Sequence, residues 1–488
     1  MLRPLTVTSV LAAGLLGACA GVPLADTDMA SDAALVPMAW HAPLPHGGQS
    51  AELARWWGQF DDPLLAELVG HAQAHSPTLA TARARIEAAR AARVAAGAAL
   101  QPSLDATGSV VRGRQDVFLP LGTSLSAALQ AGWELDVFGR NRAARDAAQE
   151  RFIGAEAGWH EARVAVAAEV GLAYTGLRAC EAQLEQSSRD ARSRAETSRL
   201  TDLSARAGFQ APAAASLAQA SAAQARAAET QQRARCAIDL HALIALTGVP
   251  AGSLRTALAA STARLPNAAS LAVTAVPAEV LAQRPDVYRA AREVLAAAGD
   301  VRRTDAERYP RIALAGMIGA TRVDTGAGTL SGGIWTLGPV SVSLPVFDAG
   351  VRRANLAAAR ARYDEALIGY AGRLRAAVRE VEDALVTLDA SAAREADARL
   401  AATGFQASLQ ASEARYRGGL GNLFELEDSR RSAVLAQSAL IDLQRERVAA
   451  WIALYRALGG GWHRPNGPAA PSEVRPAPLS ARPTVDPA

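Results

Sequence analysis

Residues 122–150 read GTSLSAALQAGWELDVFGRNRAARDAAQE, and the pattern of this stretch changes in its middle. After Gly139 no proline occurs from about Asn141 to Arg206, which favours one very long helix of roughly 95 Å. Before Gly139 apolar and polar residues alternate, as in a half-buried β-strand: Leu125, Leu129, Ala131, Trp133 and Leu135 are interleaved with Ser126, Gln130, Glu134 and Asp136. This stretch therefore predicts a strand that leads directly into a long helix.

Three further segments alternate in the same way. They lie at Leu104–Val110, at Ile312–Ile318 and at Val340–Val346, and we expect Gly326–Gly333 to form the turn between the last two. The sequence therefore predicts four strands per chain. The connecting loops Val111–Ser124 and Thr321–Gly333 are expected to face outward.

The helical segments also occur in pairs. A helix is predicted at 78–99, before Pro102, and a second proline-free segment runs from about Arg352 to Arg417. Each long helix is followed by a glycine, and Pro212 suits the first turn of a returning helix that ends near Leu246. The helix at 78–99 and the returning helix, placed end to end, would nearly match one long helix.

Landmark residues recur at equal distances in the two halves. Pro77 precedes Pro102 by 25 residues, and Pro285 precedes Pro310 by 25. Gly208 and Gly248 are 40 residues apart, as are Gly419 and Gly459. These distances predict that one module of about 170–180 residues occurs twice. The expected segments are an N-terminal signal at 1–18, an N-terminal segment at 19–75, the first repeat at 76–248, a linker at 249–283, the second repeat at 284–462 and a proline-rich disordered tail at 463–488.

Two cysteines are placed symmetrically about the first helical turn. Cys180 lies 28 residues before Gly208, and Cys236 lies 28 residues after it. Equal distances from a hairpin turn put two residues at the same height on antiparallel neighbours, where two thiols can form a disulfide in an oxidising compartment. We predict a Cys180–Cys236 disulfide. The alternative is that both are small apolar core residues that face each other.

The N-terminal residues have the pattern of an export signal. Met1 to Pro4 carry one arginine, an apolar run follows from Leu5 to Leu16, and small residues precede Cys19. The run Leu16-Gly17-Ala18-Cys19 resembles a bacterial lipobox, which implies cleavage before Cys19 and lipidation of that residue. The alternative is an ordinary secretory peptide with an incidental cysteine.

Composition excludes several classes of protein. The formal net charge is only +3, so nucleic-acid binding is not expected. All 51 basic residues are arginines, which excludes a Walker lysine or a Schiff-base lysine. His71 and His75 could share a helix face, but the sequence offers no third metal ligand. We therefore expect no cofactor, no metal site and no enzymatic activity.

Four alternating strands cannot close a barrel by themselves. Open strand edges are not tolerated in lipid, and the smallest membrane barrels have about eight strands, so several chains must share one barrel. The alternative is a small soluble sheet packed on helices.

Specific motifs carry a family resemblance from Trp56 to Trp462. They are Trp56-Trp57 with the following GQFDDP, the run LPVFDAG at 344–350 and the run ARYRGGL at 414–420. The chain resembles TolC-type outer-membrane efflux factors of the NodT or OprM-like lipoprotein branch. The resemblance implies a mixed α and β membrane protein that forms a homotrimer. Its twelve strands would form one barrel, which a periplasmic α-helical barrel continues. The lipidated N-terminal segment at 19–75 and the equatorial linker at 249–283 would contribute to an equatorial region. It also implies two protein partners, a periplasmic adaptor and an inner-membrane pump of the proton-driven RND type. Outer-membrane lipid would surround the barrel.

The same resemblance assigns roles to residues at the two helical turns. Ala207, Gly208 and Phe209 and their counterparts Gly418, Gly419 and Leu420 fall at the tips where the adaptor would bind. The alternative is turn geometry without a partner. Near the second tip the resemblance implies a periplasmic gate: Asp428 for an acidic ring, Phe424 for an apolar ring, and Arg415 and Tyr416 for a latch. The alternative there is a solvated helix face, and the acidic partner of Arg415 is left open.

We therefore expect a lipid-anchored exit duct for drugs or other small molecules in the outer membrane. Two alternatives remain at this point. One keeps the fold but assigns type I protein secretion, and the other is a periplasmic lipoprotein scaffold without a pore.

Overall fold

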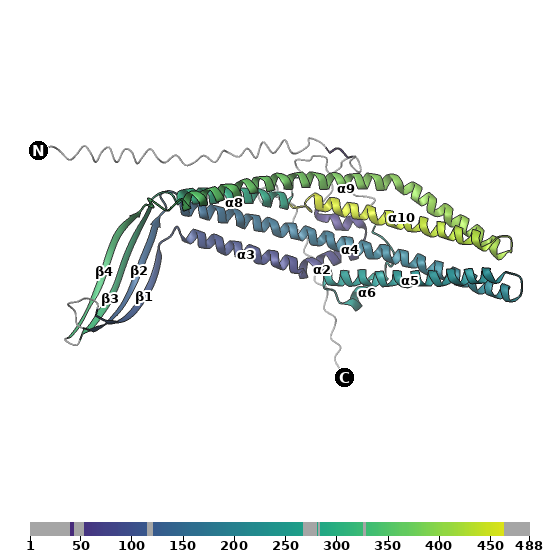
Figure 1. Ribbon diagram of the computed structural model, residues 1–488, viewed down its shortest axis with the longest axis horizontal. Coiled ribbons are helices and arrows are strands. Elements are labelled where there is room, and N and C mark those ends of the chain that lie inside the picture. Colours follow the sequence, from purple (N-terminus) through teal and green to yellow (C-terminus); the bar gives the residue numbers. More distant parts are fainter. Residues whose placement is uncertain are drawn as a thin grey trace. The chain divides into compact units, whose positions relative to one another are not determined.

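The computed structural model describes residues 40–42, 53–114, 121–266, 281, 284–325 and 328–462 (Figure 1). Four expected features lie outside the described residues: the signal peptide, the expected lipidation site Cys19, most of the expected equatorial linker beyond Pro266 and the expected tail at 463–488.

The order of elements is the same in the two halves of the chain. A helix precedes two strands, and a very long helix and its returning helix follow them. The bounds are η3 Leu53–Phe60, α2 Pro63–His75, α3 Pro77–Ala98, β1 Ser103–Gly113, β2 Gly122–Leu135, α4 Arg140–Arg206, α5 Pro212–Thr247, α6 Ala251–Ala259, α8 Pro285–Ala306, β3 Arg311–Thr325, β4 Gly328–Ser343, α9 Val351–Arg417 and α10 Leu423–Ala457. The two longest helices have 67 residues each, close to the predicted length.

Contacts divide the chain into two compact units. One contains the four strands, and its described residues lie within Ala80–Trp159 and Asp286–Ala376. The other is helical, and its described residues lie within Pro37–Leu79, His160–Pro285 and 377–462. Both α4 and α9 begin in the strand-containing unit and end in the helical unit.

The four strands form one antiparallel sheet in the order β1-β2-β3-β4, drawn as long arrows side by side in Figure 1. The register places residues of like polarity opposite one another, and it defines an apolar face. Its members on β1 and β2 are Leu104, Ala106, Gly108, Val110, Leu125, Ala127, Leu129, Ala131, Trp133 and Leu135, and on β3 and β4 they are Ile312, Leu314, Gly316, Ile318, Ala320, Gly333, Trp335, Leu337, Val340 and Val342.

The opposite face of the sheet is rich in hydroxyl groups. Ser109 and Ser126 lie opposite each other, and their hydroxyl oxygens are 2.8 Å apart. The hydroxyl groups of Thr107 and Thr321 donate to backbone carbonyls of β2. A sheet with one apolar and one polar face can separate lipid from water.

Two details of the strands differ from the prediction. The expected turn Gly326–Gly333 is mostly strand, because β4 already begins at Gly328 and Gly333 pairs with Ala320. The outward loops are accordingly shorter than Val111–Ser124 and Thr321–Gly333. Glycine is a turn signal, but within paired strands it also permits close backbone approach: a Cβ on Gly319 would lie 2.5 Å from a carbonyl oxygen of β2.

The other difference concerns the end of β4. This strand ends at Ser343, so Leu344 and Val346 lie beyond it although their alternation continues. The register of β3 and β4 shifts between Leu314 and Gly316, opposite Gly338-Pro339 on β4. Proline has no N–H for the ladder and Gly338 has a φ of +107°, so this pair of residues forms a bulge.

Small residues bring the helices of the strand-containing unit together. Gly299 of α8 lies against α4, where an added Cβ would be 2.9 Å from the Cβ of Ala147. Val301 of α8 packs against Leu356 and Ala359 of α9. The rich alanine content thus serves close helix packing rather than helix propensity alone.

An aromatic cluster forms part of the core of the helical unit. Trp56 is fully buried and lies 6.1 Å from Trp451 and 5.6 Å from Tyr455, between ring centroids. Trp57 packs on Gly171 of α4, where a Cβ would be 2.7 Å from the indole ring. The Trp-Trp motif therefore attaches the N-terminal segment to α4 and α10.

A buried polar network strengthens this attachment. The Tyr174 hydroxyl donates to Asp62 at 2.6 Å, and the Nε of Arg178 donates to the Tyr174 oxygen at 3.0 Å. Burial, together with the hydrogen bond to Asp62, raises the pKa of Tyr174 to about 12. The phenol is therefore neutral at physiological pH and acts as a donor to the Asp62 carboxylate.

Among the described helices, none is on its own both long enough and apolar enough to cross a membrane. The segments α5 and α6 meet that length and composition only when they are taken together across a bend of 116°.

Candidate functional site

The turn after α4 is closed by backbone hydrogen bonds around Gly208. The N–H of Phe209 donates to the Ser204 carbonyl at 2.9 Å, and the N–H of Gly208 donates to the Ala205 carbonyl at 3.0 Å. This pair of bonds is a Schellman motif, which requires a left-handed residue, and Gly208 has a φ of +79°. The glycine predicted at this turn is therefore required by the backbone.

The turn after α9 has the same construction. The N–H of Leu420 donates to the Arg415 carbonyl at 2.8 Å, and Gly419 has a φ of +73°. The next helix begins with a side-chain cap, because the Asn422 carboxamide oxygen accepts a hydrogen bond from the N–H of Glu425 at 2.8 Å. Both hairpins thus end in rigid turns whose geometry is determined by local hydrogen bonds.

Each turn presents an apolar side chain to solvent. Phe209 is 84% exposed and Leu420 is 78% exposed, and they occupy equivalent positions directly after the left-handed glycine. In many Schellman motifs this residue packs back on its own helix. Here neither side chain does so, which leaves two apolar groups at the ends of the hairpins.

Arg415 and Tyr416 contact different parts of the structure. Arg415 forms an ion pair with Glu425 across its own turn, at 2.6 Å, so Glu425 is the acidic partner that the sequence left open. The Tyr416 hydroxyl lies 2.7 Å from the hydroxyl of Thr201, which is buried on α4. Tyr416 therefore connects the second hairpin to the first, whereas Arg415 does not.

Phe424 and Asp428 lie apart from these contacts. They are 75% and 76% exposed, respectively, and are spaced four residues apart on α10, so they share one exposed face of that helix. The described partner of Asp428 is Arg431, one turn further on, with 3.8 Å between the charged groups. This face carries an aromatic ring and a carboxylate that are both largely exposed to solvent.

Sequence reasoning missed a buried charge cluster behind this face. Arg430 is only 2% exposed, and it donates to Glu427 at 2.8 Å and to Thr197 of α4 at 2.7 Å. Glu427 also accepts hydrogen bonds from Arg194 of α4 and from Ser221 of α5. We call Arg194, Glu427 and Arg430 the buried charge cluster. It joins α4 and α5 of the first hairpin to α10 of the second.

A signal for this cluster was present in the sequence. Leu423, Leu426, Arg430 and Ala433 are spaced by three, four and three residues, which is the spacing of a buried helix stripe. An arginine within such a stripe must be paired. The pattern therefore indicated burial of Arg430, but its partners on α4 could not be named.

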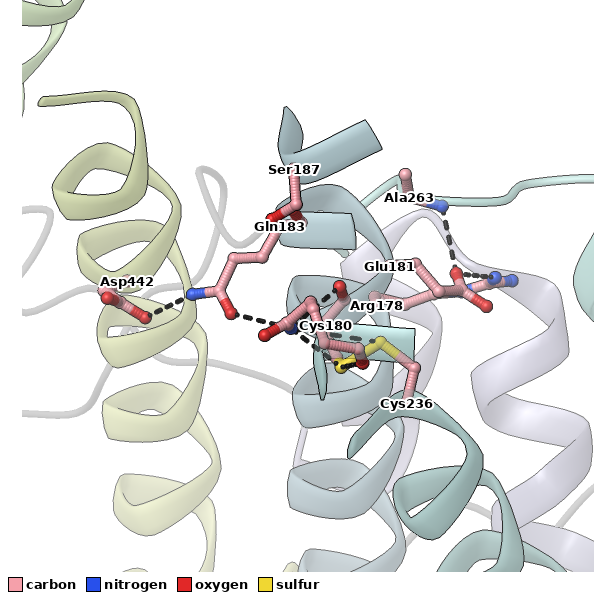
Figure 2. The surroundings of a disulfide bond; sticks show 9 residues. Arg178, Cys180, Glu181, Gln183, Ser187, Cys236, Ala263 and Asp442 are labelled. Atoms are coloured by element: carbon pink, nitrogen blue, oxygen red, sulfur yellow. Dashed lines mark hydrogen bonds and ion pairs between the residues drawn. A yellow bond between two sulfur atoms is a disulfide. The ribbon is translucent and has the colours of Figure 1, made fainter. Parts of the chain in front are cut away.

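The structure contains the disulfide that the cysteine spacing predicts. Cys180 of α4 and Cys236 of α5 are bonded, with their Cα atoms 5.5 Å apart, as Figure 2 shows. Beside this bond Gln183 of α4 reaches Asp442 of α10, to which its amide donates at 3.0 Å (Figure 2). Covalent and polar contacts thus connect three helices at one height.

The histidine pair does not gather further ligands. The rings of His71 and His75 are stacked with centroids 6.3 Å apart, and the Nδ1 of His75 lies 2.9 Å from the His71 carbonyl oxygen. In the part of the chain that the structure describes, no group of three histidine, cysteine, aspartate or glutamate side chains could hold a metal ion.

Comparison with protein families gives one match that covers most of the chain. The family described as "Outer membrane efflux protein" matches twice, at residues 68–249 and 276–460. Each match begins before a predicted repeat and includes its strands and both of its long helices.

Characterised relatives match over nearly the whole length. Outer membrane protein OprJ of Pseudomonas aeruginosa is 31% identical over 471 residues, which is 93% of this chain and 96% of the relative. The solvent efflux pump outer membrane protein SrpC of Pseudomonas putida is 28% identical, and the match covers 92% of this chain and 96% of the relative.

Solved structures agree with these sequence matches. The outer-membrane channel OprN has a TM-score of 0.76 at 28% identity, over 88% of this chain and 98% of the channel. The open state of the MtrE outer membrane channel of Neisseria gonorrhoeae has a TM-score of 0.71 at 25% identity, with the same coverage.

Proposed function

Since this chain belongs to the outer membrane efflux protein family, it is the outer-membrane channel of an efflux pump, and we propose how its hairpins attach and gate that channel. Three chains contribute four strands each to a twelve-stranded barrel, which a helical barrel continues into the periplasm. The observation that carries this function is the register of the sheet. It puts an apolar wall on one face, hydroxyl groups on the other and, within the described sheet, unpaired strand edges on β1 and β4.

The channel itself provides a passive route. The relatives are named as channels or outer membrane proteins of pumps. Transport is therefore driven by an inner-membrane partner, and the proposal is that this partner is a proton-driven RND-type pump joined through a periplasmic adaptor. The residue proposed to hold the chain to the membrane by lipid is Cys19.

The cargo is proposed to be drugs and other small, largely apolar molecules. Two relatives support this choice, because one is named for antibiotic efflux and another for solvent efflux. A passive duct needs no chemical site for its cargo, so the selectivity is assigned to the pump.

The hairpin tips are proposed to be the adaptor contacts. Ala207, Gly208 and Phe209 form one tip, and Gly418, Gly419 and Leu420 form the other. The support is the exposure of Phe209 and Leu420 on turns that are rigid, since such groups bury apolar area on binding without a large loss of conformational entropy. A double substitution of both residues by serine would weaken adaptor binding to the purified trimer and leave its conductance unchanged.

The gate is proposed to be the exposed face of α10. Threefold symmetry would bring three Asp428 carboxylates together, and three Phe424 rings would line the turn below them. The carboxylates would attract cations and repel one another. The closed state would be held by the Tyr416–Thr201 hydrogen bond and the buried charge cluster, while Arg415 stiffens the turn through Glu425.

Single-channel conductance in planar bilayers tests the proposed duct and the proposed gate. We expect a small, cation-preferring conductance that rises in the Asp428→Ala variant. The matched control is Asp397→Ala, which removes an exposed carboxylate of α9. A trimer that conducts equally well before and after Asp428→Ala would rule out the acidic constriction, and a trimer that never conducts would rule out the duct.

A further inference from the structure

The apolar face of the sheet ends in charged residues on the side away from the helices. All connections from the strands to helices leave from the other end, near Ser103, Leu135, Arg311 and Ser343. On the same face Arg322 of β3 lies in the row of Val110 and Leu125, and Arg112 of β1 lies in the next row, two residues beyond Val110. We call these two residues the arginine rim.

The register places the side chains of the arginine rim on the apolar face of the sheet. Leu125 pairs with Val110 on one side and with Arg322 on the other. Arg112 is two residues beyond Val110, and side chains two residues apart on a strand point to the same face. The outermost row of this face consists of Arg112 with Thr123, Asp324 and Thr329, and Arg322 lies one row closer to the helices.

The length of the apolar face along the strands places the arginine rim at a membrane interface. From Leu135 to Leu125 the apolar side chains of β2 cover about 33 Å of strand, at roughly 3.3 Å per residue. With a tilt of about 40° this length corresponds to a height of roughly 25 Å, which is that of the apolar band of membrane barrels. The arginine rim therefore lies where the hydrocarbon ends and headgroups begin.

The charge of the rim is positive. Arg112 and Arg322 are both exposed, and Arg112 forms no ion pair with a described residue. Arg322 lies 3.5 Å from Asp324, which also accepts a hydrogen bond from Thr329 at 2.5 Å. One carboxylate thus balances two guanidinium groups in the described part of this face, and Arg114 adds a further exposed arginine just after β1.

We propose that the arginine rim binds the phosphate groups of lipopolysaccharide, the phosphorylated glycolipid of the outer leaflet. The end of the sheet away from the periplasmic helices reaches the outer leaflet, so this lipid is the anion at that height. A guanidinium group presents paired N–H donors that match a phosphate, and the acyl chains would lie on Leu125, Val110 and the residues beneath them. The inference rests on the outer-membrane location and is independent of cargo, adaptor and gate.

Native mass spectrometry of the delipidated full-length trimer tests the proposal, with hexa-acylated bisphosphoryl lipid A as the probe. We expect the Arg112→Gln/Arg322→Gln double variant to bind about tenfold more weakly than wild type, and Arg112→Lys/Arg322→Lys to keep part of the affinity. Asp324→Asn removes the opposing charge, so its affinity should rise about threefold. This gain of binding cannot result from misfolding.

The controls test whether binding depends on these two arginines, on the phosphate groups of the lipid and on the lipid class, and whether the channel remains intact. Arg353→Gln/Arg362→Gln removes two exposed arginines of α9 and should not change binding. Phosphate-free lipid A should bind wild type as weakly as bisphosphoryl lipid A binds the double glutamine variant, and conductance should be equal in all variants. Equal lipid A binding by wild type and the double glutamine variant would overturn the proposal. So would arginine-dependent binding of phosphatidylglycerol that equals binding of lipid A.

Discussion

Cys180 and Cys236 are bonded across the first helical hairpin, each 28 residues from Gly208, with Cα atoms 5.5 Å apart. The bond closes a loop of 56 residues that contains the whole tip. The corresponding positions of the second hairpin carry no cysteine pair, so the two hairpins differ in covalent restraint. We expect the disulfide to confine opening motions of the first hairpin to the residues between the bond and the tip.

Removal of the disulfide should destabilise the first hairpin. Loop closure of this length contributes about 2–4 kcal/mol to the free energy of unfolding in the chain-entropy description. The Cys180→Ser/Cys236→Ser trimer should therefore unfold at a lower denaturant concentration than wild type. Reductant should weaken wild type in the same way and leave the double variant unaffected. If non-reduced peptide mapping of the exported protein found both thiols free, the bond would be disproved.

The buried charge cluster gives a second prediction. Arg430→Met would leave Glu427 and Glu413 with one buried cation fewer, which should lower the free energy of unfolding by about 3–5 kcal/mol. The neighbouring Arg431→Met removes an exposed arginine and should change stability by less than about 0.5 kcal/mol. Denaturant unfolding of the trimers measures both. Equal losses in the two variants would show that burial of Arg430 has no energetic consequence.

The hydrogen bond between Tyr416 and Thr201 should restrain opening. Tyr416→Phe removes it and should cost about 0.5–1.5 kcal/mol, which we expect to appear as a higher open probability in single-channel records. Thr201→Val should have a similar effect, and the double variant should add little to either single one. Fully additive effects of the two substitutions would mean that the contact does not couple the hairpins.

The glycines at the tips should not tolerate a side chain. Gly208→Ala and Gly419→Ala place a Cβ on a residue with positive φ and should each lower stability by about 1 kcal/mol. Gly404, within α9, has helical geometry and open space where a Cβ would lie, so Gly404→Ala should be neutral or stabilising. Limited proteolysis at the turns measures the difference. Loss of stability only in Gly404→Ala would contradict this interpretation.

Much of the local structure could be predicted from residue patterns. Absence of proline from Asn141 to Arg206 predicted α4 almost to the residue, because a helix interior excludes proline. Alternation predicted the strands, but glycine gave the wrong turn at Gly326–Gly333. Local glycine content cannot distinguish a turn from a strand whose neighbours come close, since that depends on the paired strand.

The candidate site was predicted less completely. Gly208 and Gly419 could be placed because their backbone requirement is local. The partner of Arg415 was not evident, although Glu425 is only ten residues away, since it faces Arg415 only once the turn has closed. Arg430 and Thr197 lie 233 residues apart in the chain, and no periodicity links positions on different hairpins.

Residue patterns predicted the helices, the existence of the four strands, the two helical turns at Gly208 and Gly419 and the two faces of each strand, since propensity, proline, glycine and polarity act over a few residues. Tertiary contacts were needed to identify the partners of Arg415, Tyr416 and Arg430. They were also needed to place the bulge at Gly338-Pro339 and to bring Arg112 and Arg322 onto one face. These depend on register and on helix packing. Both arise when segments distant in the chain bury apolar surface together, and a linear pattern does not contain that information.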